Sequence, residues 1–396
     1  MLDSPLLRRT AVGGVGLAAL LTTAHAVNDA FANILPVLLP TLQQRFGLGE
    51  AVLAAFVALI SFSSNVLQAF AGALADRWGR RRTAAFGLIL GSLLMSLIAV
   101  VPTLWAVFLV LAVGGLGSAI FHPGAASMAR QAGERKGLAM GLFGAGGPFG
   151  SAVMPIVALW LLRSYGPWAL TWLAPVGVAV GVALLVLAPH QPPPERARRP
   201  KLFDRSLFFG PVGLLALVGI LRATAYISFL NAMPLYLANV RGYAPDAAIL
   251  GLTLATFQIA ASVGVVAAGA LEPKVGRTPL IAGTMLLALP ALLATLALPA
   301  GSLAFYAAVA AAGAFTNASI PLLVISAQDL APDAVATASG MLMGFTWGMA
   351  GVAYLGFGAV QELVGLVPAL AAGFAFVVPA ALLATVVLRR HRTAIG

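Results

Sequence analysis

Residues 72–82 read Gly-Ala-Leu-Ala-Asp-Arg-Trp-Gly-Arg-Arg-Arg, and this stretch decides how the chain is organised. Its first three residues and its Gly-Arg pair return as Gly-Ala-Leu at 269–271 and Gly-Arg at 276–277, at a constant offset of 197. Three further matches follow at an offset of 198, namely Asn33 with Asn231, Pro36 with Pro234, and Pro123 with Pro321. An internal repeat of this length predicts two halves with the same succession of structural elements.

The composition identifies the environment of these halves. Hydrophobic residues make up 61% of the 396-residue chain and charged residues only 9%, whereas soluble globular proteins have about 25% charged residues. A helix needs about 20 mostly apolar residues to cross a bilayer core of about 30 Å. The sequence therefore predicts an all-α membrane protein without a large soluble domain. The absence of cysteine excludes disulfides, thiolate metal sites and cysteine nucleophiles.

Apolar runs separated by loop residues give twelve expected transmembrane helices. Their approximate limits are 13–40, 51–74, 83–101, 104–129, 137–162, 167–188, 207–238, 247–271, 278–298, 302–327, 335–360 and 367–388. Between the sixth and seventh runs lies the only long polar connection, which contains three consecutive prolines and five basic residues. We therefore expect an N-terminal six-helix half over 1–188, a cytoplasmic linker over 189–206 and a C-terminal six-helix half over 207–396, with a central cavity between the halves.

The basic residues predict the orientation of the chain in the membrane. The formal charge of +11 reflects 23 Lys and Arg against 12 Asp and Glu. Nineteen of the basic residues fall on one side of the expected helices, and only Arg45, Arg163 and Arg241 fall on the other. Cytoplasmic loops carry such an excess, so we expect both termini in the cytoplasm of a cell whose inner membrane holds the protein. The charge then faces anionic lipid, and no nucleic-acid partner is expected.

The stretch at 72–82 lies between the second and third expected helices, where it resembles the G-x-L-a-D-r-x-G-r-r motif of the major facilitator superfamily. The resemblance implies twelve helices in two six-helix halves and a cytoplasmic gate formed by Gly72, Asp76, Arg77, Gly79 and Arg80. Glycines permit a tight turn, and a carboxylate can bind arginines and a helix N-terminus. The alternative is a turn that only fixes topology. The second copy has Pro273 in place of the acid, so we expect it to gate weakly or not at all.

Three further stretches have a common likeness, namely His-Ala-Val-Asn-Asp at 25–29, Gly-Gly-Leu-Gly-Ser-Ala-Ile-Phe-His-Pro at 114–123 and Gly-Gly-Pro-Phe-Gly-Ser at 146–151. Within the superfamily, they resemble the fosmidomycin-resistance group of efflux proteins. Two departures concern the direction of transport. The fourth helix lacks the arginine of many proton-coupled members, and Pro148 is not followed by the x-x-G-G of the antiporter motif.

Polar side chains inside the first expected helix are candidates for proton coupling. A charged side chain at a helix centre costs about 2.5–3.5 kcal/mol on insertion scales, so such residues are functional candidates. His25 and Asp29 are four residues apart and share a helix face, and a carboxylate beside an imidazole gives two coupled titratable groups. The alternative is a structural polar network. His122, before Pro123, is a further proton candidate or a cap on a helix bend.

A second set of polar residues is expected to bind substrate. Arg222 lies inside the seventh expected helix with Tyr226 one turn further on. A guanidinium can hold a carboxylate or phosphonate with two hydrogen bonds, and it could equally be the permanent partner of Asp29. The complete set of expected substrate-binding residues is Asn28, Asn33, Arg222, Tyr226, Asn231 and Asn317.

The sequence features bear on three classes of function. A proton-coupled exporter of small amphipathic or anionic compounds accounts for the polar residues, the gate motif and the resemblance. A proton-coupled importer of a sugar or organic acid would use the same residues. The third class, a membrane enzyme or a sensor, is not expected, because the chain has no catalytic triad pattern in any loop, no metal-ligand spacing and no phosphate-binding glycine loop. We therefore expect a monomeric transporter whose partners are a small molecule, protons and the bilayer, with no cofactor and no metal.

Overall fold

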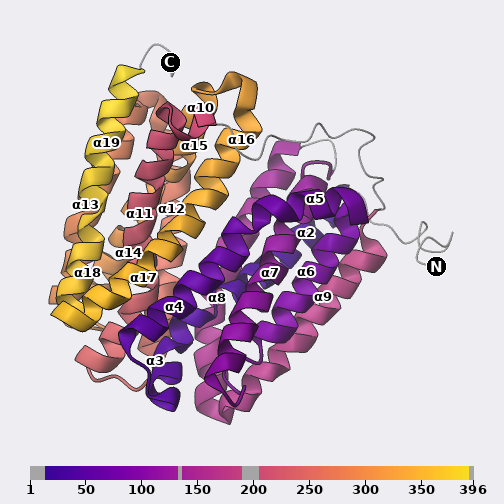
Figure 1. The fold of residues 1–396 in the computed structure, drawn as a ribbon, viewed down its shortest axis with the longest axis vertical. Helices are drawn as coiled ribbons and strands as arrows, with labels where there is room; N and C mark the ends of the chain where they lie inside the picture. The colour runs from indigo at the N-terminus through magenta and orange to yellow at the C-terminus, as the bar shows by residue number, and fades with distance from the viewer. Residues whose placement is uncertain (1–13, 133–135, 190–204, 392–396) are drawn as a thin grey trace. The chain divides into compact units, whose positions relative to one another are not determined.

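The computed structural model describes residues 14–132, 136–189 and 205–391, and all regular secondary structure in these ranges is helical (Figure 1). Within them, nine helices are long and apolar enough to cross a membrane. The all-α membrane fold is thus confirmed. The first three expected helices do not appear among the nine, because the first is split near Asn33, the second contains an irregular turn, and the third has only 16 residues. The count of twelve stays a prediction.

Packing of the backbone divides the chain into two compact units. The first unit comprises Met1–Leu35 and Phe62–Arg199, and the second comprises Pro36–Ser61 and Pro200–Gly396. A segment from the first sequence half therefore packs with the second unit.

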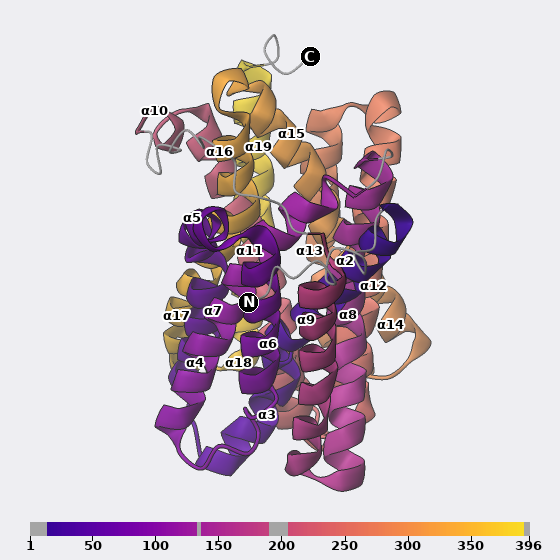
Figure 2. The same ribbon diagram turned by 90° about the vertical axis from the view of Figure 1, so that its right-hand side faces the viewer.

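The first unit contains eight described helical segments. They are α2 (Gly14–Ala32), η1 (Phe62–Val66), α5 (Gln68–Trp78), α6 (Arg80–Met95), α7 (Leu104–Ala129), α8 (Lys136–Tyr165), η2 (Pro167–Leu173) and α9 (Ala174–Leu187). Its apolar core joins side chains of α2, α6, α7, α8 and α9, with Leu21, Phe121 and Leu184 fully buried. Helices α7 and α9 both pack along α6 (Figure 2).

Small residues allow α6 and α7 to approach closely. A Cβ atom at Gly117 would lie 2.6 Å from the backbone nitrogen of Gly91 and 2.7 Å from the carbonyl oxygen of Gly87. Membrane helices associate through such backbone contacts because lipid offers no hydrophobic driving force between them. The Gly114–Ser118 segment of α7 is thereby held firmly against α6. This contact fixes the position of the polar residues that follow the segment on α7.

The second unit contains the remaining helices. They are α3 (Leu35–Phe46), α4 (Glu50–Ser61), α10 (Arg205–Phe208), α11 (Pro211–Leu235), η3 (Tyr236–Val240), α12 (Ala248–Val275), α13 (Arg277–Ala297), α14 (Leu303–Ala318), α15 (Ile320–Asp329), η4 (Pro332–Ala334), α16 (Val335–Gly340), η5 (Met341–Phe345), α17 (Thr346–Val364), α18 (Leu366–Ala375) and α19 (Val377–Arg390).

Helix α4 packs along α17 in this unit. The Oε1 atom of Glu362 accepts a hydrogen bond of 3.1 Å from the backbone nitrogen of Ala51, in the first turn of α4. A carboxylate at this position satisfies a free N–H group and interacts favourably with the positive end of the helix. The contact attaches α4 to the end of α17.

The two copies of the repeated loop have the same backbone geometry. Gly79 separates α5 from α6 with φ +90°, and Gly276 separates α12 from α13 with φ +87°. A left-handed φ is strained for residues with a Cβ atom, so each copy needs glycine here. At this loop, the internal repeat read from the sequence is also a repeat of backbone geometry.

Three described turns are π-helical, namely η1, η3 and η5. A π turn holds one residue more than an α turn, is rare in proteins and occurs frequently at functional sites. In the second unit, η5 joins α16 directly to α17, and Trp347 is the second residue of α17.

Candidate functional site

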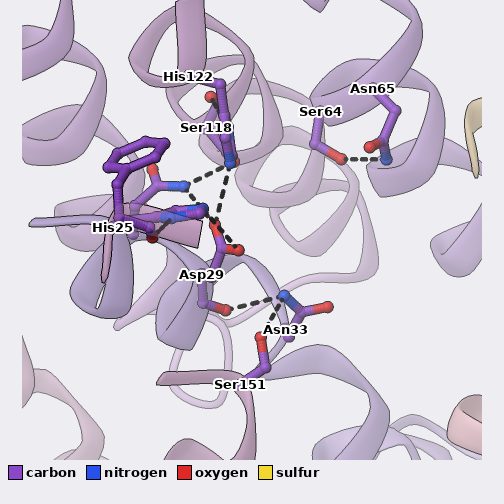
Figure 3. A network of polar contacts seen from close by, with 10 residues as sticks. His25, Asp29, Asn33, Ser64, Asn65, Ser118, His122 and Ser151 are labelled. Atoms are coloured by element: carbon purple, nitrogen blue, oxygen red, sulfur yellow. Dashed lines mark hydrogen bonds and ion pairs between the residues drawn. The ribbon is translucent and has the colours of Figure 1, made fainter. Parts of the chain in front are cut away.

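Three titratable side chains meet in the first unit, and we call them the proton cluster: His25 and Asp29 on α2, and His122 on α7 (Figure 3). The Nε2 atom of His25 lies 3.2 Å from Oδ2 of Asp29, and the Nε2 atom of His122 lies 3.2 Å from Oδ1. His25 is buried, and Asp29 and His122 are partly buried. The structure therefore unites all three residues predicted to couple protons.

Backbone carbonyl groups fix the hydrogen on each imidazole ring. The Nδ1 atom of His25 lies 2.6 Å from the carbonyl oxygen of Phe143, and Nδ1 of His122 lies 2.8 Å from that of Ser118. A carbonyl oxygen can only accept, so each Nδ1 must carry a hydrogen and donate it. A neutral ring then has a bare Nε2 facing the Asp29 carboxyl group.

Local sequence explains why these residues come together. His25 stacks on Phe143, with ring centroids 4.3 Å apart and planes inclined by 17°. A Cβ atom at Gly147 would lie 2.7 Å from Nε2 of His25 and would also contact the Asp29 carboxylate. Only glycine at this point of α8 leaves room for the cluster.

Two of the four asparagines predicted to bind substrate, Asn28 and Asn33, extend the proton cluster. Asn28 donates to Oδ1 of Asp29 at 2.9 Å and to the hydroxyl group of Ser118 at 3.0 Å. Asn33 donates to the carbonyl oxygen of Asp29 at 2.9 Å and to the hydroxyl of Ser151 at 3.1 Å. In this conformation, both amides therefore position Asp29 and its helix.

Among the described residues, the cluster is also the one set of three or more whose potential metal-ligating atoms lie within 4.8 Å of one another. The separations of 3.2 Å between Nε2 and carboxylate oxygens are nevertheless hydrogen-bond distances. We interpret the arrangement as a direct hydrogen-bond network.

A second polar site lies on α11, α12, α14 and α17 of the second unit. Arg222 is only 2% exposed. Its Nη1 atom donates to Oδ1 of Asn317 at 2.8 Å and to the carbonyl oxygen of Thr316 at 3.4 Å. Its guanidinium carbon lies 4.7 Å from the ring centroid of Trp347. Arg222 is thus held by neutral groups.

Tyr226 and Asn231 complete this side of α11. The Tyr226 hydroxyl donates to Oε1 of Gln258, and its ring packs edge-on against Trp347 at 4.9 Å. Asn231 donates to the carbonyl oxygen of Ile227 at 2.9 Å, within its own helix. Of the predicted substrate residues, Arg222, Tyr226 and Asn317 therefore share one site, whereas Asn231 bonds one turn back along α11.

Comparison with known proteins identifies the family. The Major Facilitator Superfamily family model matches residues 21–355. The chain belongs to the major facilitator superfamily. This confirms the resemblance seen at 72–82, and the protein is an integral membrane transporter rather than an enzyme.

The chain is also similar in sequence to individual members of the superfamily. The fosmidomycin resistance protein of Escherichia coli is 28% identical over 365 residues, which cover 89% of this chain and 87% of that protein. An uncharacterised MFS-type transporter of Bacillus subtilis, YfnC, is 24% identical over 88% of this chain and 87% of its own.

Solved structures share the fold at low sequence identity. A bacterial homologue of the human lysosomal transporter Spinster, in an inward-facing and occupied conformation, superposes with a TM-score of 0.78 at 16% identity, covering 96% of this chain and 97% of its own. The nucleoside transporter NupG gives a TM-score of 0.73 at 15% identity, with 95% and 99% covered.

The superfamily loop motif is only partly described. Gly79 and Arg80 lie at the α5–α6 junction, and Arg77 is exposed. The side chain of Asp76 and the surroundings of Gly72 lie outside the described residues. The gating role of the motif stays a prediction.

The second copy of the motif contains an ion-pair network that we did not predict. Arg277 donates from Nε to Oε1 of Glu272 at 2.7 Å and from Nη1 to Asp329. Glu272 stands one position before Pro273, so the acid is displaced along the repeat rather than lost. A search allowing this one-residue displacement would have found it.

Other contributing residues were also missed from the sequence. Ser118 could have been found, since it precedes His122 by one helical turn. Phe143 and Trp347 gave no signal, because an aromatic residue in an apolar helix is usually a packing residue. Their roles depend on contacts between segments far apart in the sequence.

Proposed function

We propose that this transporter is a proton-coupled exporter of small amphipathic or anionic compounds that works by alternating access. The E. coli relative, named for fosmidomycin resistance, supports export. The proton cluster supports proton coupling, and the buried Arg222 supports an anionic substrate.

The hydrogen count in the proton cluster carries the proposal. Each of the two contacts between an Nε2 atom and the Asp29 carboxyl group needs one hydrogen, which lies on the ring or on the carboxyl group. With both Nδ1 atoms already protonated, the complete network holds two exchangeable protons and a net charge of +1. Loss of one proton leaves a nitrogen lone pair facing a carboxylate oxygen at 3.2 Å. That contact is unfavourable, so release of a proton drives rearrangement between α2 and α7.

A proton-coupled importer of a sugar or organic acid is the second candidate. The same cluster would serve it, because symport and antiport differ only in which step of the cycle carries the proton. Import therefore predicts uptake in the direction of proton entry, and export predicts opposite movement.

Transport by purified protein in vesicles with an imposed pH gradient tests the proposal. Asp29→Asn keeps the side-chain shape but removes the titratable carboxyl group, so we expect at least about 100-fold slower gradient-driven transport. Substrate exchange without a gradient should persist. Asp246→Asn, in the loop before α12, is the matched control. Concentration of substrate by the well-folded Asp29→Asn variant would overturn the proton site.

The proposed orientation places the protein in the inner membrane with both termini in the cytoplasm. Reporters fused after Arg392 and near Arg199 should then show cytoplasmic activity, and a reporter near Gly242 should show the opposite. A cytoplasmic signal near Gly242 would contradict both the orientation and the twelve-helix topology.

A further inference from the structure

Arg222 is a buried cation without an anion. No carboxylate among the described residues lies within ion-pair distance of its guanidinium group, and its neighbours Asn317, Trp347 and Tyr226 are neutral. Charged residues inside a membrane protein usually pair with one another or face a substrate pathway. A permanent partner is missing from the part of the chain that the structure describes.

The contacts of Arg222 leave one particular edge of the guanidinium group free. Both hydrogen bonds to described residues use Nη1. One planar face lies over the indole ring of Trp347. The Nε atom is fully buried and has no hydrogen-bond partner. The remaining edge consists of Nε and Nη2, whose parallel N–H groups match the two oxygens of a carboxylate.

The surroundings of this edge indicate the rest of the ligand. Trp347 and Phe257 each pack against Tyr226, and Phe229 stacks on Phe257 with centroids 4.1 Å apart. Aromatic side chains provide apolar surface with defined stacking geometry. One fixed positive charge among neutral aromatic groups is complementary to an apolar or aromatic molecule with one negative charge.

We propose that Arg222 and Trp347 form the recognition site for the carboxylate of an aromatic monoanion, which binds through Nε and Nη2. The inference rests on the proposed function in that the bound anion is the exported compound. The Nε atom is buried in this conformation, so binding through both atoms requires neighbouring side chains to move, as an alternating-access cycle provides. The second negative charge of a phosphonate dianion would have no partner here.

Equilibrium binding to the purified full-length protein tests the site, with benzoate, its neutral analogue benzamide, and phenylphosphonate as probes. We expect benzoate to bind at least about ten-fold more tightly than either of the others, because benzamide has no negative charge and the second negative charge of phenylphosphonate has no partner at this site. Equal binding of benzoate and benzamide would overturn the anion site. Tighter binding of phenylphosphonate would overturn the assignment to a monoanion.

Substitution of the arginine separates recognition from structure. Arg222→Gln should weaken benzoate at least about ten-fold and leave benzamide unchanged, and Arg222→Lys should give an intermediate loss, because an ammonium group keeps the charge without the paired donors. The exposed Arg163→Gln is the matched control. Unchanged benzoate affinity in Arg222→Gln would overturn the proposal.

The unfolding temperature of the Arg222→Gln variant distinguishes a binding role of Arg222 from a structural role, because the two roles predict changes in opposite directions. Removing an unpaired buried charge should keep or raise the unfolding temperature of Arg222→Gln, whereas breaking a structural pair would lower it. Benzoate should raise the unfolding temperature of the unmodified protein and not that of the variant. A large fall in Arg222→Gln and Arg222→Lys alike would assign Arg222 to folding.

All these measurements use no pH gradient. Benzoate binding that depends on Arg222 in a protein without proton-driven transport would overturn the proposed function and leave this site intact. Proton-driven transport by a protein whose benzoate binding does not depend on Arg222 would overturn this site and leave the proposed function intact.

Discussion

The polar sites of the two units occupy equivalent places in the repeat and have opposite chemistry. At the offset of 198, Asn28 corresponds to Tyr226 and Ser118 to Thr316. Asn28 and Ser118 belong to the surroundings of Asp29, while Tyr226 and Thr316 belong to those of Arg222. The first site contains both an acid and its bases, so the binding or release of a proton is enough to change its charge. The second contains one fixed cation, so only an incoming anion can neutralise it. The two copies of the repeat therefore hold polar sites of different chemistry, one for each of the two proposed roles.

After Asp29→Asn, the largest effect should come from filling the space beside the proton cluster. Gly147→Ala places a Cβ atom 2.7 Å from Nε2 of His25, so the contact with Asp29 must break. We expect a fall of at least about ten-fold in gradient-driven transport, measured in vesicles, with benzoate binding at the Arg222 site preserved.

Gly144→Ala is the control for this prediction, because a Cβ atom at Gly144 meets nothing within 4 Å. Equal losses in the two variants would show that helix flexibility, rather than the cluster, explains the effect. Loss of benzoate binding in Gly147→Ala would show that the two sites are not separate.

A smaller effect should follow from removing one histidine. His122→Gln keeps an amide near the Asp29 carboxyl group but cannot be protonated, so the network holds one exchangeable proton instead of two. We expect partial transport with fewer protons exchanged per substrate, measured from the pH change in vesicles. His391→Gln, at the end of α19, is the control. An unaltered proton count in His122→Gln would limit the cluster to His25 and Asp29.

The smallest effect should come from the ion pairs of the second loop copy. Glu272→Gln removes one partner of a partly exposed pair, and such pairs contribute about 0–1 kcal/mol. We therefore expect an unfolding temperature within a few degrees of that of the unmodified protein.

Asp76→Asn should instead reduce turnover more than binding, if the first copy acts as a gate. A strong transport defect in Glu272→Gln would transfer the gating role to the second copy.

Local patterns predicted much of this structure. The spacing of His25 and Asp29 within one helix placed them on a common face, and the repeated Gly-Arg pairs located both glycine turns. The approach of His122 depends on packing between α2 and α7, which a single sequence does not encode as a pattern. Asn317 lies 95 residues from Arg222, and their contact requires α14 to pack near α11. Long-range contacts of this kind were the part that the sequence could not supply.

The π turn η5 gives the second site a means of rotation. Such a turn contains one residue more than the α-helical turn it replaces, and one residue of an α-helix corresponds to about 100° of rotation. Conversion of η5 into an α turn would therefore rotate the following residues about the helix axis by that amount. Trp347 lies just beyond η5, so its indole ring would swing away from the guanidinium of Arg222. Deletion of Gly344 would make this rotation permanent. The affinity of the variant for benzoate would then show whether the anion binds only when the indole ring faces Arg222.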